Sequence, residues 1–198
     1  MARAAMNGTS AEPGALAKPV KRAGTKIVIR VDHTALRRGH VAEGETCEAA
    51  GVGPVPVRFV NGLLADGEAF TVVVGTDQEG RVRRVAHLGH KKVVEVDAVL
   101  DALADKGHDV TDAHTSRKPN VYQRSALDWT NPTCSVAGCD QPRQEIDHRA
   151  DWADTHLTQL DQLDGYCRHH HWLKTHHGYH LEPGTGRRRF LPPSGGDP

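Results

Sequence analysis

Two short pairs of metal-binding side chains constrain this chain more than any other feature of its sequence. Four residues separate Cys134 from Cys139, and Gly138 allows a tight turn between them. Two residues separate Cys167 from His170, so on a helix these positions, i and i+3, share one face. Structural zinc takes four tetrahedral cysteine or histidine ligands from two such short pieces of chain. The spacing therefore predicts a closed zinc site of three cysteines and one histidine; the alternative is that the four are core residues without a metal.

Composition and cysteine usage agree with a metal site of this kind. Only 37% of the 198 residues are hydrophobic and 5% are aromatic, so a bound metal would supply much of the folding free energy of its segment. Three of the four cysteines cluster with histidines, which favours a metal site in a reducing compartment over a disulfide framework. Cys47 stands apart and is expected to be a small buried residue. With neither a signal peptide nor an apolar run of about 20 residues, the sequence predicts a cytoplasmic protein that does not enter a membrane.

A second set of candidate ligands lies between and beside the two pairs. Consecutive helical side chains diverge by about 100°, so if His170 faces the zinc, His171 points toward a neighbouring site. Asp147 offers the carboxylate that a hard divalent cation prefers. The adjacent His148 can accept a proton from water at neutral pH, and a metal with a base can hydrolyse a phosphodiester. Because neighbouring strand residues point to opposite faces, Asp147 and His148 share a site only if their strand twists or ends there.

Charge is distributed unevenly in this half of the chain, although the formal net charge is zero. Eight acids and two bases lie between residues 128 and 164, whereas five bases and one acid lie between residues 165 and 190. An acidic centre beside a basic rim suits a site that binds a cation and then a polyanion. Ordinary solvated charge explains the same pattern about as well.

Hydrophobic periodicity and turn residues divide the chain into four parts. We predict a disordered lead-in at residues 1–24, a small α+β module at 25–110, a zinc-stapled domain at 119–192 and a loose tail at 193–198. The elements expected are strands at 26–32, 69–74, 81–86, 179–182 and 187–190, and helices at 55–64, 96–106 and 121–129. Residues 109–120 read as a polar linker. The fold class predicted is therefore α+β.

The order of these motifs resembles that of the HNH endonucleases, whose core is the ββα-metal fold. More closely, residues 26–192 resemble the actinobacterial HNH proteins that carry the thirteen-E-twelve repeat region. The phrases that carry the resemblance are IVIRVD from residue 27, GVGPVPV from 51, VAHLG from 85, TCSVAGCD from 133, EIDH from 145 and WLKTH from 172. The motifs before residue 110 mark kinship only, whereas those after 133 carry chemistry.

The resemblance implies a metal-dependent endonuclease that cuts double-stranded DNA. It makes Asp147 and His171 the ligands of a catalytic Mg²⁺ or Mn²⁺, and His148 the general base that activates water. It also makes the two short pairs the ligands of structural zinc. The candidate phosphate contacts, which solvated surface charge would explain nearly as well, are Arg168, Lys174 and His176.

The asparagine that gives the family name its middle letter is replaced in this chain. Where the family has Asn before Leu, this sequence has Gln162 before Leu163. The resemblance implies that this amide orders the loop bearing the base or ligates the metal, and a displacement near 1 Å at a catalytic site can cost about 100-fold in rate. Asp161 or Asp164 could substitute as a ligand. Two alternatives therefore stay open: a zinc-stapled DNA-binding module whose nuclease site has decayed, and a structural zinc domain that serves protein contacts.

Overall fold

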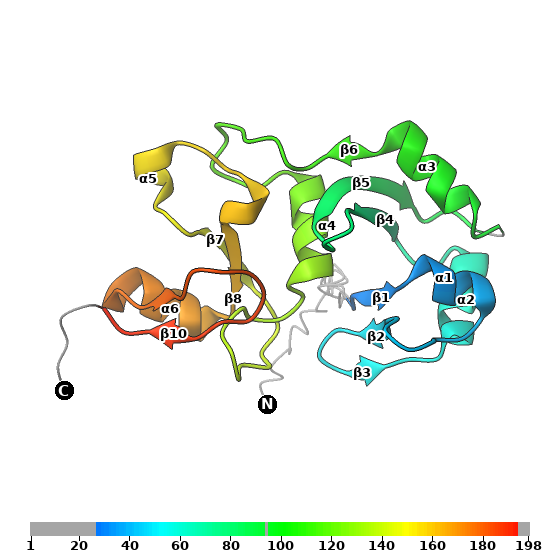
Figure 1. The fold of residues 1–198 in the computed structure, drawn as a ribbon, viewed down its shortest axis with the longest axis horizontal. Coiled ribbons are helices and arrows are strands. Elements are labelled where there is room, and N and C mark those ends of the chain that lie inside the picture. The colour runs from blue at the N-terminus through cyan, green and yellow to red at the C-terminus, as the bar shows by residue number, and fades with distance from the viewer. Residues whose placement is uncertain (1–26, 94, 194–198) are drawn as a thin grey trace, which may run out of the picture.

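The computed structural model describes residues 27–93 and 95–193. The predicted lead-in at residues 1–24 lies outside this part of the chain, as does the tail from residue 194. Within it, helices alternate with small antiparallel sheets of two or three strands (Figure 1), which confirms the α+β fold class. No helix in the described part is long and apolar enough to cross a membrane.

The chain begins with a small sheet covered by two helices. The strands are β1 (Ile29–Val31), β2 (Cys47–Ala49) and β3 (Gly53–Pro54), and the helices are α1 (His33–Arg38) and α2 (Val57–Asp66). The α2 helix begins two residues later than expected because Pro56 has an extended backbone and serves as its N-cap. The buried core consists of Ala35, Leu36, Cys47, Val57, Val60 and Leu64. Cys47 is thus the small buried residue that the sequence predicted.

A second sheet follows, built on the predicted hairpin. Its strands are β4 (Thr71–Thr76), β5 (Val82–Gly89) and β6 (His108–Asp109), all antiparallel. Helix α3 (Ala98–Lys106) packs on it and ends at Gly107, as the sequence indicated.

Helix α4 (Val121–Thr130) joins the two halves of the molecule. Asn120 caps it and forms a reciprocal capping box with Gln123. On one side α4 packs against β5, where Ala126 shares a core with Val82, Val85 and Val110. At its far end Asp128 pairs with the half-buried Arg143. The helix that the sequence assigned to the second domain therefore also completes the core of the first, and Figure 1 shows it standing between them.

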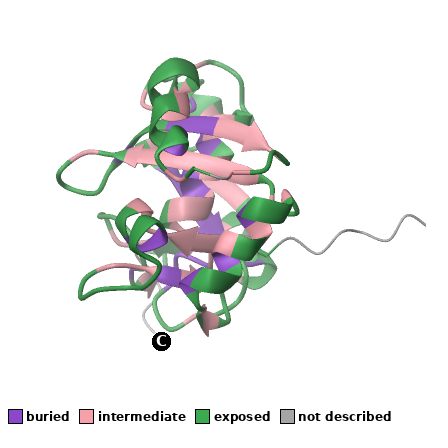
Figure 2. Ribbon diagram, turned by 90° about the vertical axis from the view of Figure 1, so that its right-hand side faces the viewer, coloured by how far each residue is buried: buried purple, intermediate pink, exposed green. Residues whose placement is uncertain are grey.

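The second half is a hairpin followed by a helix. Strands β7 (Glu145–His148) and β8 (Leu163–Tyr166) pair antiparallel, with α5 (Trp152–Thr155) and the 3₁₀ helix η1 (Leu160–Gln162) in the connection, and α6 (Arg168–His177) follows. This element order is that of the predicted ββα arrangement. Figure 2 shows most of the buried residues on helices and strands, whereas most of the loops are exposed. The core of this half contains few large side chains: Cys134, Val136, Tyr166 and Cys167.

The final strand pair is shorter than expected. It consists of β9 (His180–Leu181) and β10 (Phe190–Leu191), so residues 187–189 were wrongly predicted as strand. Arg188 is buried, and its guanidinium donates to the carbonyl oxygens of Glu182, Gly184 and Gly186. The chain therefore wraps around this side chain before the strand can start.

Candidate functional site

Four side chains from the two predicted pairs meet behind the hairpin. The ligand atoms of Cys134, Cys139, Cys167 and His170 all lie within 4.8 Å of one another. His170 Nδ1 is 3.4 Å from Cys134 Sγ and 3.3 Å from Cys167 Sγ, and Cys139 Sγ is 4.0 Å from Cys167 Sγ. Tetrahedral zinc with Zn–S bonds near 2.3 Å places its sulfur ligands about 3.8 Å apart. The donors present thus form a site that could hold a metal ion and whose geometry fits zinc.

Local backbone structure explains how each pair is presented. Gly138 adopts a left-handed backbone (φ 81°) in the first turn, where Cys139 N donates to Val136 O at 3.1 Å. Cys167 is the N-cap of α6, and His170 lies in the first turn of that helix. The two pairs therefore meet because β8 delivers the start of α6 against the turn.

Burial disfavours the thiolate form of the cysteines in this cluster. It raises the pKa of the Cys134 thiol to about 11, and the neighbouring Cys167 and Cys139 add to the rise. Burial also lowers the pKa of His170, with His169 contributing. A metal binds thiolates and neutral imidazole, so its binding would release protons from these cysteines.

A second pair of ligand-type side chains lies on the other face of α6. His171 Nε2 is 3.7 Å from Asp147 Oδ2, and both side chains are partly exposed. Octahedral Mg²⁺ with bonds of 2.0–2.1 Å places adjacent donors about 3 Å apart and opposite donors about 4.2 Å apart. The observed 3.7 Å lies between these two values, so the two side chains would have to shift by several tenths of an ångström to bind one such ion together. His171 points away from the cluster that holds His170, as the helix geometry predicted.

Lys174 also contacts this carboxylate. Its ammonium nitrogen lies 2.6 Å from Asp147 Oδ2, and its side chain is largely buried. A cation bound by Asp147 would compete with Lys174 for the same oxygen. The role predicted for Lys174 as a phosphate contact would require this ion pair to open.

His148 ends β7 and points to a different set of partners. Its ring is buried, and Nε2 lies 2.8 Å from the hydroxyl of Thr158. Burial lowers the pKa of His148; Asp147 opposes this effect, while Arg117, Lys174 and His114 reinforce it. Neighbouring strand residues point to opposite faces, and Asp147 nevertheless lies close enough to His148, the last residue of the strand, to act on its pKa.

The segment predicted as a linker forms one wall of this site. Thr158, fully buried, donates its hydroxyl to Ser116 O at 2.7 Å. The backbones of His114 and Thr158 pair through two hydrogen bonds of 3.1 and 2.8 Å. Sequence reasoning missed these contacts because Ser116 and Thr158 are 42 residues apart and no motif joins them.

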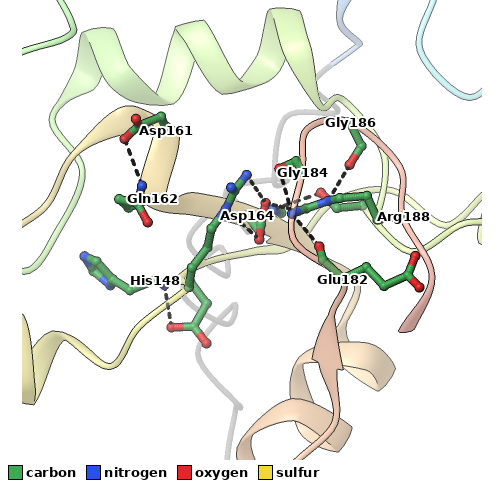
Figure 3. Close-up of polar contacts among 12 residues, drawn as sticks. His148, Asp161, Gln162, Asp164, Glu182, Gly184, Gly186 and Arg188 are labelled. Atoms are coloured by element: carbon green, nitrogen blue, oxygen red, sulfur yellow. Dashed lines mark hydrogen bonds and ion pairs between the residues drawn. The ribbon is translucent and has the colours of Figure 1, made fainter. Parts of the chain in front are cut away.

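Of the two acidic residues proposed as substitute ligands, Asp164 is buried and Asp161 is exposed. Asp164 lies opposite Asp147 in the hairpin, but it is buried and paired with Arg188 and with Arg149 (3.2 Å). Figure 3 shows Arg188 reaching from the C-terminal loop to this carboxylate. Asp164 is therefore held by two guanidinium groups, and it could replace a metal ligand only if both ion pairs opened. Asp161 is exposed and accepts a weak hydrogen bond from Gln162.

The Gln162 side chain does not order the loop that carries His148. It is exposed, and among the described residues its amide bonds Asp161 alone, at 3.4 Å (Figure 3). The Gln162 backbone carbonyl instead accepts from the N–H of Arg149, at 2.9 Å, just after His148. The contact that the resemblance assigns to a side-chain amide is thus made by the main chain.

The other two predicted DNA contacts lie on the open side of α6. Arg168 is exposed at the start of the helix, and His176 is exposed near its end. The His176 ring lies 5.8 Å from the ring of the half-exposed Trp172. Both are accessible to a ligand, so their role as phosphate contacts stays a prediction.

Comparison with known proteins gives a distant relationship. The chain is 30% identical over 95 residues to uncharacterized proteins of two strains of Mycobacterium tuberculosis, CDC 1551 / Oshkosh and ATCC 25618 / H37Rv. The match covers 46% of this chain and 21% of each relative, so the chain spans about a fifth of the length of the curated relatives it matches. No family model matches the sequence. No solved structure matches it either.

Proposed function

We propose that the protein is a metal-dependent DNA endonuclease of the HNH type. The observation that carries the proposal is the placement of Asp147 and His171, 3.7 Å apart, with His148 at the end of the same strand as Asp147. A hairpin and a helix hold all three beside a separate cluster that fits zinc. One cluster would stabilise the fold, and the other would carry out the reaction.

In this proposal each residue has one task. Asp147 and His171 would hold a Mg²⁺ or Mn²⁺ ion, which would stabilise charge on the scissile phosphate and on the leaving oxygen. His148 would accept a proton from the attacking water, and its lowered pKa keeps the imidazole neutral and able to do so. Lys174, once released from Asp147, would neutralise a phosphate oxygen, and Arg168 would contact the DNA backbone.

The position of Gln162 supports one alternative. Its side chain is exposed and its amide bonds Asp161, so among the described residues the amide that the family uses near the base is not bonded to His148. A zinc-stapled module that binds DNA without cutting it would leave the same arrangement. The two functions predict different results from one assay.

Cleavage of supercoiled plasmid tests the proposal. The purified chain, loaded with one zinc, is incubated with plasmid in Mg²⁺, Mn²⁺ or EDTA. Nicked or linear product is expected only with the divalent ion. The His148→Gln variant, whose amide still reaches Thr158 but cannot act as a base, is expected to lose about 10²- to 10⁴-fold in rate.

A second histidine provides the matched control. His87 in β5 is also partly buried and hydrogen-bonded to a hydroxyl, that of Ser125 at 2.9 Å, but it lies in the first half of the chain. His87→Gln is expected to cut as the parent does. Parent protein that shifts DNA on a gel but yields no product with either metal would favour the decayed binding module.

A further inference from the structure

The environment of His148 limits which of its ring nitrogens can carry a proton. Nε2 faces the Thr158 hydroxyl at 2.8 Å, and that hydroxyl lies 2.7 Å from the carbonyl oxygen of Ser116. The carbonyl oxygen of Arg117 is more distant, at 3.4 Å. A threonine hydroxyl has one hydrogen to donate. Since a carbonyl can only accept, that hydrogen goes to Ser116.

The direction of the first hydrogen bond follows from the second. With its hydrogen committed to Ser116, the Thr158 oxygen can only accept from His148. Nε2 of the neutral ring must then carry the proton, which leaves the Nδ1 lone pair free. Within the described residues no side chain or backbone group bonds to Nδ1. The nitrogen without a protein partner is thus the one left able to accept a proton.

Thr158 is itself held rigidly, so its hydroxyl cannot turn away at little cost. It is fully buried, and its backbone pairs with that of His114. The His114 ring bonds the side-chain oxygen of Gln123 at 2.8 Å, and Gln123 is fully buried in the capping box of α4. A continuous set of contacts therefore connects the start of α4 to His148. It runs through a stretch of chain that carries no metal ligand.

We propose that Thr158 is a positioning residue that fixes the tautomer of His148, with the proton on Nε2 and Nδ1 free to accept the proton of water. The effect of this tautomer on catalysis rests on the proposed nuclease function. The tautomer itself is a property of the folded chain and does not depend on that function. The hydroxyl, not the bulk of the side chain, performs this role. Removing the hydroxyl while keeping the shape of the side chain should allow both neutral tautomers of His148 to form. Metal and DNA binding should remain intact.

Two substitutions separate the hydroxyl from the packing. Thr158→Val keeps the branched shape and removes the hydrogen bond, whereas Thr158→Ser keeps the hydroxyl and removes a methyl group. The tautomer of His148 is read from the ¹⁵N shifts of histidine-labelled protein at pH 8, where the ring is neutral, with His148→Gln to assign the signals. The same proteins are compared in plasmid cleavage, with kcat and KM measured separately.

The expected result is a single Nε2–H tautomer in the parent and in Thr158→Ser, and a mixture of tautomers in Thr158→Val. Thr158→Val should also lose about 10- to 100-fold in kcat with little change in KM, and Thr158→Ser should restore most of that rate. An Nδ1–H tautomer in the parent, or an unchanged tautomer in folded Thr158→Val, would overturn the inference. If Thr158→Val fails to fold, the tautomers of the parent and of Thr158→Ser still decide it. If the parent cuts no DNA, the nuclease proposal fails, and the tautomer measurement still tests the role of Thr158.

Discussion

Loss of one ligand from the four-residue metal cluster should unfold half of this protein and leave the other half folded. Cys139 is the suitable position because it is only partly buried, so replacing it with serine removes a ligand with little effect on packing. Structural zinc contributes about 10–16 kcal/mol in small zinc domains. If four ligands share this equally, one thiolate is worth about 2.5–4 kcal/mol, or about 70- to 900-fold in zinc affinity.

This loss of binding free energy is large compared with the stability that packing alone can give the second half. Its hydrophobic core cluster contains four buried residues, two of which belong to the Cys/His cluster that could hold the metal. Whole domains are stable by only about 5–15 kcal/mol, so the second half has little stability to spare. The first half has its own core of six buried residues and should remain folded.

The assay is metal content per chain combined with an amide NMR spectrum of Cys139→Ser. We expect less than one zinc and a loss of dispersed signals from residues after about 133, with signals from β4 and β5 retained. Cys47→Ala is the matched control, since it removes the one cysteine outside the cluster and should keep its zinc. A Cys139→Ser protein that holds one zinc and gives an unchanged spectrum would refute the assignment of this ligand.

Three further predictions concern the hairpin and its neighbours. Lys174→Met removes the cation that competes with a metal for Asp147. Because such an ion pair is worth about 1 kcal/mol, isothermal titration should show Mn²⁺ binding about three- to tenfold more tightly. Equal or weaker binding would contradict this competition. Burial lowers the pKa of His148 below its usual 6.5, so the base stays neutral as the pH falls through that value. A pH–rate profile of plasmid cleavage should therefore lose activity only below pH 6.5, and half-loss at or above it would count against His148 as the base. Arg188→Met leaves Asp164 buried with Arg149 alone, and urea unfolding should show a loss of about 3 kcal/mol, whereas a loss under 1 kcal/mol would mean that Arg149 suffices.

The zinc-type cluster and the adjacent helix were predictable because their geometry is local. A spacing of three positions at the start of a helix places Cys167 and His170 on one face, and the same rotation directs His171 elsewhere. The predicted hairpin and helices of the first half followed for the same reason, because turn residues and apolar periodicity act over a few positions. In the second half, the start of the last strand was predicted less accurately because a tertiary contact, the buried Arg188 side chain, intervenes there.

The sequence by itself determined which side chains can bind a metal and where regular elements form, because covalent spacing sets both. Only the tertiary structure decided what those side chains face. It paired Asp164 with Arg149 and Arg188, turned the Gln162 amide toward solvent, and placed Ser116 against Thr158 across 42 residues. Contacts at such separations depend on how whole elements pack, and no local pattern encodes them. The orientation of the candidate base therefore comes from a segment that the sequence presented as a linker.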